Sequence, residues 1–160
     1  MRTAVAVTLG LLAVASVSAT AAPSGSPLGD WLDQTKKAVI HVGPCADAAQ
    51  ALCGQITWLR EPTLPDGKPK RDVNNTDPAL RNRPICGLPM LGGFTPDTEP
   101  GKWKGGRIYD PESGKTYEST MRVDPDGTLR VRGYVMVAMF GKSQTWTRPP
   151  GPLPACTPPS

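Results

Sequence analysis

Apolar and polar positions alternate most clearly between Gly105 and Arg148, and this alternation predicts four β-strands joined by three turns. Residues 124–127, Asp-Pro-Asp-Gly, place proline and glycine as a three-residue hairpin loop requires. That loop fixes the register and makes one face of the hairpin mostly apolar. The expected cross-strand pairs are Asp124 with Thr128, Val123 with Leu129, Met121 with Val131, Ser119 with Gly133, and Tyr117 with Val135.

A second turn, residues 110–114, allows a four-residue loop that puts the apolar positions of the preceding strand on the same side. The two turns therefore agree on which face is inside. One pair is unfavourable, because Arg122 would face Arg130 on the outer face, where solvent and the nearby Asp124 compensate. The pairs set by this second turn are Asp110 with Lys115, Arg107 with Glu118, and Ile108 with Tyr117.

The rest of the chain adds short elements and no long amphipathic helix. The expected elements are a short strand at Trp31, strands over Lys36–Val42, Gly54–Arg60 and Cys86–Phe94, at most one helical turn in Asp47–Leu52, and a long loop over Glu61–Arg83. The apolar faces would be formed by Ala38, Ile40 and Val42 on one strand, and by Ile56 with Trp58 on the next. Closing such a sheet removes its edges, so the predicted fold is all-β, an antiparallel up-and-down eight-stranded barrel with at most short helical turns.

The N-terminus has the pattern of a secretory signal peptide, with Arg2, the apolar run Ala4–Val17 and then Ala19-Thr20-Ala21. We therefore expect a periplasmic or secreted protein. No cysteine lies near the cleavage site, so no lipid anchor is expected, and no later apolar run is long enough for a membrane span. The expected organisation is a signal peptide at 1–21, a lead segment at 22–28, a barrel domain at 29–148 and a Pro-rich tail at 149–160.

The charge balance gives no indication of a nucleic-acid partner. Without Arg2 the chain carries 17 Lys and Arg against 14 Asp and Glu, a net charge of +3. The two signs are mixed along the chain, and no aromatic stripe accompanies the basic residues.

Four cysteines, an even number in an exported chain, indicate disulfide bonds. The preferred pairing is Cys45–Cys53, which closes a short excursion between two strands, with Cys86–Cys156, which would hold the Pro-rich tail against the barrel. By chain entropy alone the long loop would contribute roughly 4 kcal/mol and the short one about 2–3 kcal/mol. A zinc site is the alternative, but the cysteine spacing and a single histidine suit it poorly.

The densest polar cluster lies between Asp72 and Arg83. It begins like a calcium-binding loop, but Asp77 stands where that loop needs glycine and Arg83 where it needs glutamate, so no specific metal site or cofactor is expected. Three alternatives stay open. They are a nonspecific cation site, a loop whose Asn and Asp bond their own backbone before a helical turn at Pro78–Arg83, and a lid whose Arg81 or Arg83 meets an anionic ligand group or an internal carboxylate.

No set of residues predicts an enzyme. His41 is the only histidine and lies on an expected strand, and no G-x-S-x-G nucleophile motif occurs. The carboxylate pairs Asp110 with Glu112 and Asp124 with Asp126 lie in hairpin turns, where turn chemistry already explains them. We therefore expect no catalytic residues.

Several longer motifs resemble one bacterial exported family, designated domain of unknown function 2147. They are 53–59 (CGQITWL), 72–88 (DVNNTDPALRNRPICGL), 103–111 (WKGGRIYDP), 132–134 (RGY) and 140–148 (FGKSQTWTR). Gly29, Trp31 and Arg148 also resemble the lipocalin arrangement, in which the arginine packs over the tryptophan at the closed end of the barrel. The resemblance implies a lipocalin-like barrel in the bacterial envelope and no established activity.

These observations favour a small-molecule binding protein that holds an apolar or amphipathic ligand in the barrel mouth, with the loop Asp72–Arg83 as rim. The register places Tyr117 facing in and Tyr134 facing out. The alternative is an envelope interaction or scaffold protein whose barrel is filled by its own side chains and holds no ligand. The candidate ligand-binding or rim residues are Trp58, Asn75, Asp77, Arg81, Arg83, Trp103, Tyr109 and Tyr117.

Overall fold

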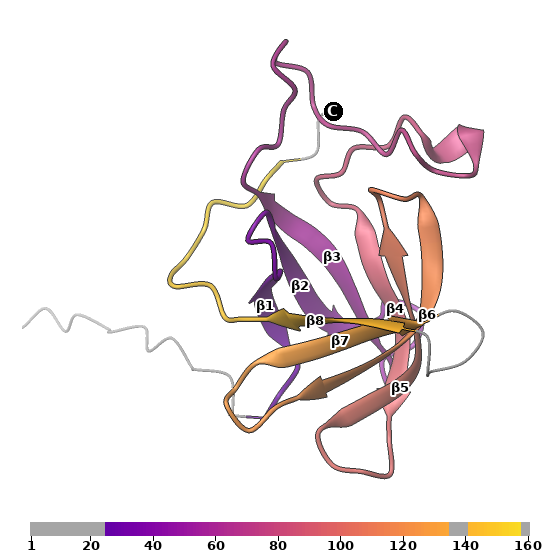
Figure 1. Ribbon diagram of the computed structural model, residues 1–160, viewed down its shortest axis with the longest axis vertical. Coiled ribbons are helices and arrows are strands. Elements are labelled where there is room, and N and C mark those ends of the chain that lie inside the picture. Colours follow the sequence, from indigo (N-terminus) through magenta and orange to yellow (C-terminus); the bar gives the residue numbers. More distant parts are fainter. Residues whose placement is uncertain (1–24, 135–140, 158–160) are drawn as a thin grey trace, which may run out of the picture.

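Eight strands form one antiparallel sheet in which each strand pairs with the next along the chain (Figure 1). The structure is a computed structural model that describes residues 25–134 and 141–157. It confirms the predicted all-β fold. The strands are β1 (Gly29–Leu32), β2 (Ala38–Pro44), β3 (Leu52–Leu59), β4 (Pro89–Pro96), β5 (Lys102–Asp110), β6 (Lys115–Val123), β7 (Leu129–Tyr134) and β8 (Gly141–Trp146).

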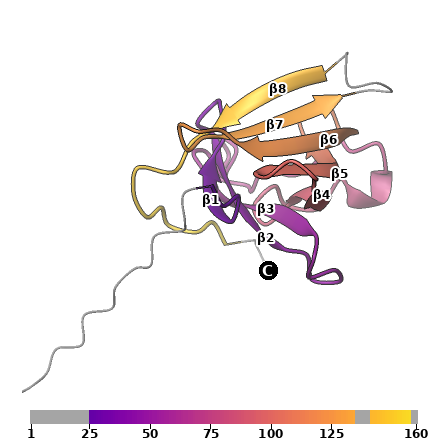
Figure 2. The same cartoon turned by 90° about the horizontal axis from the view of Figure 1, so that it is seen from below.

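The sheet curls into a half-barrel whose two edges meet at one point. The backbone amide of Leu32, at the end of β1, donates to Thr147 at 2.8 Å, and that of Thr147 donates back at 3.0 Å. The backbone amide of Thr145 also donates to the side chain of Gln34 at 3.1 Å. Figure 2 shows the end of β8 near β1, so the first and last strands approach each other at this one point.

The register of the β5–β7 hairpins is the one predicted from their turns. Every described pair agrees, including Ile108 with Tyr117 and Met121 with Val131. The expected partner of Tyr117 on β7 lies outside the described residues, as does the signal peptide predicted at 1–21. Arg122 does face Arg130, and Asp124 pairs with both, at 2.5 Å and 2.8 Å, which removes the repulsion.

The interior is filled at one end of the half-barrel, where large side chains are buried. Among them are Trp31, Phe94, Met121, Leu129 and Trp146. A Cβ atom added at Gly106 on β5 would lie 2.3 Å from the Phe94 ring, so the lack of a side chain there lets that ring cross the interior. We call this end the closed end.

Strand β3 contains an irregularity that changes one predicted face. Ile40 pairs with Ile56, but the preceding Val39 pairs with Trp58, so Thr57 is an extra residue in the ladder. Such a bulge reverses the side on which the following residue lies. The expectation that Ile56 and Trp58 share a face is therefore wrong, and Trp58 lies on the side of Val39.

Residues 60–88 form a long connection between β3 and β4, which extends past the predicted loop Glu61–Arg83 because the strand expected from Cys86 begins at Pro89. It contains one short 3-10 helix, η1 (Pro78–Leu80), in which the backbone amide of Ala79 donates to the Asp77 side chain at 2.9 Å. In the segment Asp47–Leu52 no helix forms, and the backbone amide of Cys45 instead bonds Ala51 at 2.8 Å.

Both disulfides of the preferred pairing are present, Cys45–Cys53 and Cys86–Cys156. The second joins the long connection to the C-terminal tail, whose Cys156 amide also donates to the Thr57 carbonyl at 2.7 Å. The bulged part of β3 is therefore where the tail is held (Figure 1).

Within the described residues, no helix has both the length and the apolar character needed to cross a bilayer.

Candidate functional site

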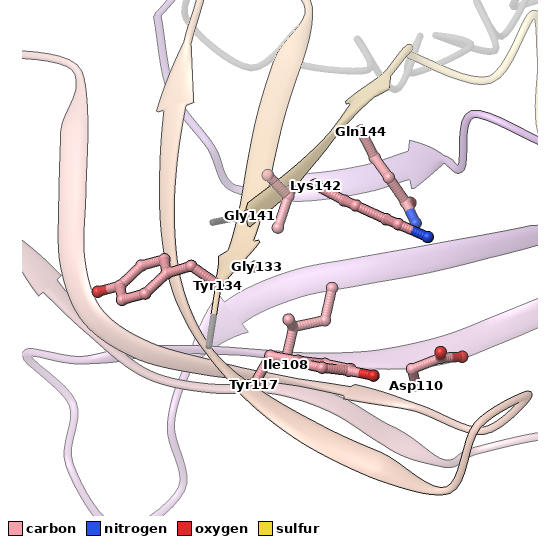
Figure 3. A pocket seen from close by; sticks show the side chains of 9 residues that line it. Ile108, Asp110, Tyr117, Gly133, Tyr134, Gly141, Lys142 and Gln144 are labelled. Carbon is pink, nitrogen blue, oxygen red and sulfur yellow. The ribbon is translucent and has the colours of Figure 1, made fainter. Parts of the chain in front are cut away.

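The end of the half-barrel opposite the closed end is hollow, and we call it the mouth. The β1–β2 and β5–β6 turns lie here, with the start of the long connection. One cavity, of about 430 Å³, lies against β5 to β8, and its apolar floor is formed by Ile108, Tyr117 and Val131. Figure 3 shows this hollow with the polar ends of Asp110, Lys142 and Gln144 around it.

A second cavity, of about 400 Å³, adjoins the first and shares Asp110 and Gln144 with it. Its lining is apolar inside and charged at the edge. The apolar residues come from β2, β3, β4 and the long connection: Ile40, Ile56, Leu59, Ile85 and Met90. The charged edge contains Lys37, Arg60, Glu61, Lys70 and Glu112. Both cavities have the size of small-ligand sites, and the first also has the apolar floor with a few polar groups that is typical of them.

Strand β8 forms the wall that carries the polar groups of the first cavity. Its residues Lys142, Gln144 and Trp146 pair with Gly133, Val131 and Leu129 of β7, and paired residues share a face of the sheet. Since Val131 and Leu129 are buried in the core, all three β8 side chains are on the inner face. Their character changes along the strand, from buried tryptophan at the closed end to lysine at the mouth.

Gln144 has a fixed orientation because the Trp146 indole can only donate. The Nε1 atom of Trp146 donates to Oε1 of Gln144 at 2.8 Å, so the amide nitrogen of Gln144 is left to face the cavity. In Figure 3 the Lys142 and Gln144 side chains run side by side from β8. Within residues 25–134 and 141–157, neither the Lys142 ammonium nor the Gln144 amide nitrogen has a hydrogen-bond partner.

Asp110 faces these donors across the cavity, but its carboxylate is already used in the β5–β6 turn. Oδ1 accepts the backbone amide of Glu112 at 3.0 Å, and Oδ2 accepts the Ser113 hydroxyl at 2.7 Å. Tyr117 lies in the cavity floor as expected, while the Tyr134 ring turns away from the hollow (Figure 3). The predicted inward and outward directions of these two tyrosines therefore agree with the structure.

A buried carboxylate organises the long connection away from the mouth. Asp72 is fully buried, and its side chain accepts bonds from the Tyr109 hydroxyl at 2.5 Å, from Asn75 at 2.8 Å and from Nε of Arg83 at 2.8 Å. Arg83 also stacks on the Tyr109 ring at 5.2 Å. We call these four residues the Asp72 cluster.

The Asp72 cluster explains the pKa values of its two acidic members. Burial would raise the pKa of Asp72, but hydrogen bonds from Tyr109, Asn75 and Arg83 and the Arg83 charge outweigh it and lower that pKa below its ordinary value. Burial, followed by the hydrogen bond to the Asp72 carboxylate, raises the pKa of the Tyr109 phenol. The cluster is therefore an ionised, satisfied anchor.

Three of the eight predicted residues, Asn75, Arg83 and Tyr109, belong to this anchor. With Asp77 and Tyr117 they line a third, more open hollow of about 1000 Å³ on the outer side of β5 and β6. That the loop Asp72–Arg83 forms the rim of a ligand site stays a prediction. The internal-carboxylate alternative holds for Arg83, while Arg81 donates to the Asn75 carbonyl at 2.8 Å and Asp77 caps η1. None of Asn75, Asp77, Arg81, Arg83 and Tyr109 lines either mouth cavity. The reason is that a fully buried carboxylate must be satisfied, and Tyr109 on the outer face of β5 supplies a donor.

The remaining aromatic candidates also lie away from the mouth. Trp58 is carried to the other side of β3 by the bulge, and Trp103 packs against the core near the closed end, opposite Met121. Of the eight candidates, only Tyr117 lines a mouth cavity. Lys142 and Gln144 were missed because they resemble surface residues, although their alternation with Trp146 placed them on the inner face.

The closed end is covered as the lipocalin resemblance implied. The Arg148 guanidinium lies 3.6 Å from the centre of the Trp31 ring, and the Trp31 indole donates to the Pro27 carbonyl at 2.7 Å. Gly29 leaves room for this contact, since a Cβ there would lie 3.0 Å from Arg148. Burial lowers the pKa of Arg148, and Asp30 partly offsets this.

Other candidate chemistry is accounted for by local structure. His41 pairs with Asp30 at 2.6 Å on the exposed surface. Within the described residues, no group of three or more His, Cys, Asp or Glu side chains is arranged to hold a metal ion.

Comparisons with known proteins agree with this architecture. A solved structure described as "Protein HP1028 from the human pathogen Helicobacter pylori belongs to the lipocalin family" is similar, with a TM-score of 0.64 and 23% sequence identity. The match covers 77% of this chain and 82% of that chain, and it shows a shared fold. No curated protein matches the sequence. The model of the family described as "Uncharacterized protein conserved in bacteria (DUF2147)" matches residues 29–148, more than half of the chain, and the chain therefore belongs to that family.

Proposed function

We propose that this protein binds a small apolar or amphipathic molecule in the mouth of the half-barrel and that it does so without catalysing a reaction. The observation that carries the proposal is the pair of adjoining cavities, of about 430 Å³ and 400 Å³, with an apolar floor and a charged edge. Burying an apolar group on such a floor contributes roughly 25 cal/mol per Å² of surface removed from water.

The proposal includes export to the bacterial envelope, where the ligand would be met. The two disulfides support this, because such bonds persist in oxidising compartments. The similarity to a lipocalin-family structure supports a binding role by analogy of fold. We infer no nucleic-acid partner, since the basic residues are interspersed with acidic ones.

The second candidate function is a scaffold whose interior is filled and whose surface or tail binds a protein partner. It is supported by the closed end, where Trp31, Phe94 and Trp146 leave the interior packed. The hollow mouth favours the binding role over this one.

Titration with the neutral apolar dye N-phenylnaphthylamine tests the binding role through the dye's fluorescence. The wild-type protein should bind the dye, and dodecanol should displace it. Gln144→Trp should block binding, because this side chain lies between the two cavities. Thr145→Trp is the matched control, as the neighbouring residue faces outward and is exposed. Absence of dye and dodecanol binding to the folded wild-type protein would contradict the binding role.

A further inference from the structure

The geometry points to a ligand with an anionic head, such as a long-chain carboxylate, whose head is held by Lys142 and Gln144 and whose chain lies on the apolar floor. This inference rests on the proposed binding function and names the chemical class of its ligand. It starts from the two unused donors on the inner face of β8.

The donors form a pair that suits a carboxylate. Lys142 and Gln144 are two positions apart on one strand and on one face, so their ends lie beside each other, as Figure 3 shows. The ammonium supplies a charge and up to three donors, and the amide nitrogen, fixed by the Trp146 bond, supplies uncharged donors. A carboxylate can accept from both at once, and charge-assisted bonds are the stronger kind.

The negative groups nearby make no hydrogen bond or ion pair with these donors. The Asp110 carboxylate accepts Glu112 and Ser113, and it makes no ion pair with Lys142. Glu112 is exposed and lies 3.9 Å from Lys37. A ligand anion therefore meets an ammonium that makes no ion pair with a carboxylate of the described residues.

The other cations around the cavities are less suited to this role. Lys37 and Lys70 already pair with Glu112 and Glu61, at 3.9 Å and 3.2 Å. Arg60 makes no side-chain bond or ion pair within the described ranges, but it follows the end of β3 at the exposed edge of the second cavity. Arg60 is therefore the rival head-binding residue and the matched control.

The apolar chain has a continuous path from these donors. Gln144 and Asp110 border both cavities, so a chain that begins at Lys142 passes over Ile108 and Val131 toward Ile56 and Met90. The glycine at 133 keeps this path open beside Lys142, since a Cβ there would already lie 3.2 Å from Ile108.

Calorimetric titration with dodecanoate, dodecanol and dodecylamine at neutral pH tests the inference, since the three probes differ only in the head. Wild-type protein should bind dodecanoate about fivefold more tightly than dodecanol, and dodecylamine least tightly. Lys142→Met should remove the preference for dodecanoate and leave dodecanol binding unchanged. Arg60→Met should change the dodecanoate affinity by less than about twofold.

Each other outcome overturns the inference. If Lys142→Met binds dodecanoate as tightly as the wild type while dodecanol still binds, the head lies elsewhere and the binding function stands. If only Arg60→Met loses affinity for dodecanoate, the carboxylate head lies at the exposed edge of the second cavity. If dodecylamine binds more tightly than dodecanoate, a cationic head lies beside Asp110. If neither dodecanoate nor dodecanol binds to the wild-type protein, the proposed function itself fails.

Discussion

Arg148, just after the last strand, lies over Trp31 on the first strand, with its guanidinium carbon 3.6 Å from the ring centre. The same guanidinium donates to the carbonyls of Ser26, Leu28 and Asp30, at 3.0 Å, 3.0 Å and 3.2 Å. One side chain therefore fastens the segment before β1 to the end of β8, next to the bridge between Leu32 and Thr147.

Arg148→Ala should lower the free energy of unfolding by about 2–3 kcal/mol, because a stacked cation and several hydrogen bonds are lost together. Arg148→Lys should restore less than half of the loss, since an ammonium cannot reproduce the planar set of donors. Urea unfolding measures both. Arg107→Ala, on the exposed outer face of β5, is the control and should cost less than about 0.5 kcal/mol. Full restoration of the free energy of unfolding by Arg148→Lys would show that only the charge matters and would contradict this prediction.

The Asp72 cluster should make stability fall in acid. The pKa of Asp72 is lowered in the folded protein, so its stabilising contribution is complete above the unfolded value of about 3.9 and is lost as the pH falls through the folded pKa. Asp72→Asn should be less stable than wild type at neutral pH, and the difference should shrink below about pH 4. Urea unfolding across this range gives the measurement.

Asp66→Asn is the control for that pH series. Asp66 is exposed, and although Lys68 lowers its pKa as well, solvent screens this pair, so the substitution should have little effect at any pH. A difference between wild type and Asp72→Asn that stayed constant down to about pH 2 would show that Asp72 is not ionised in the cluster.

Gly114 should tolerate alanine far less well than Gly127. Both have positive φ, of 69° and 81°, but a Cβ at Gly114 would lie 1.8 Å from the Asn74 carbonyl oxygen, whereas nothing lies within 4 Å at Gly127. Gly127→Ala should cost about 1–2 kcal/mol from backbone strain alone, and Gly114→Ala should cost at least twice as much in unfolding free energy.

Limited proteolysis would locate the effect of the Gly114 change. Asn74 also donates to the carbonyls of Pro111 and Glu112, at 3.3 Å and 3.0 Å, so displacement of the β5–β6 turn should free the long connection. New cleavage is expected between residues 61 and 83 in Gly114→Ala and not in Gly127→Ala. Similar cleavage patterns in the two variants would contradict the contact between turn and connection.

The two disulfides should differ in what they stabilise. Removing Cys86–Cys156 as a double serine variant should cost about 4 kcal/mol by chain entropy, and removing Cys45–Cys53 about 2–3 kcal/mol. Thermal unfolding gives the order of the two losses. Only the first variant should release the tail to an added protease, because Cys156 is the residue that ties it to the long connection. Tail release in both variants would contradict this assignment.

The hairpins could be predicted because their turns carry the information. The segments 110–114 and 124–127 each specify a loop length, and the loop length fixes which residues face each other. The bulge at Thr57 could not be predicted in this way, since Ile56, Thr57 and Trp58 alternate apolar and polar as they would in a regular strand. It is this residue that moved Trp58 out of the expected face.

The site was harder to predict than the fold because contacts far apart in sequence decide it. The polar residues between Asp72 and Arg83 indicated a ligand site, and the sequence did not show that Tyr109, distant in the chain, satisfies the buried carboxylate of this segment. Lys142 and Gln144 could have been found by extending the alternation from Trp146 back along its strand. The residue types argued against it, since lysine and glutamine are usually exposed.

The same strands form both the packed end and the hollow end of the half-barrel. Residues at the packed end are constrained by core packing, and residues at the hollow end are not. Trp146 is held by the core, whereas the side chain of Lys142, four residues earlier on β8, makes no hydrogen bond or ion pair among the described residues. A substitution at the hollow end therefore leaves the packed end intact. Single substitutions can thus change which ligand such a protein prefers, while the packed half that maintains its shape stays the same.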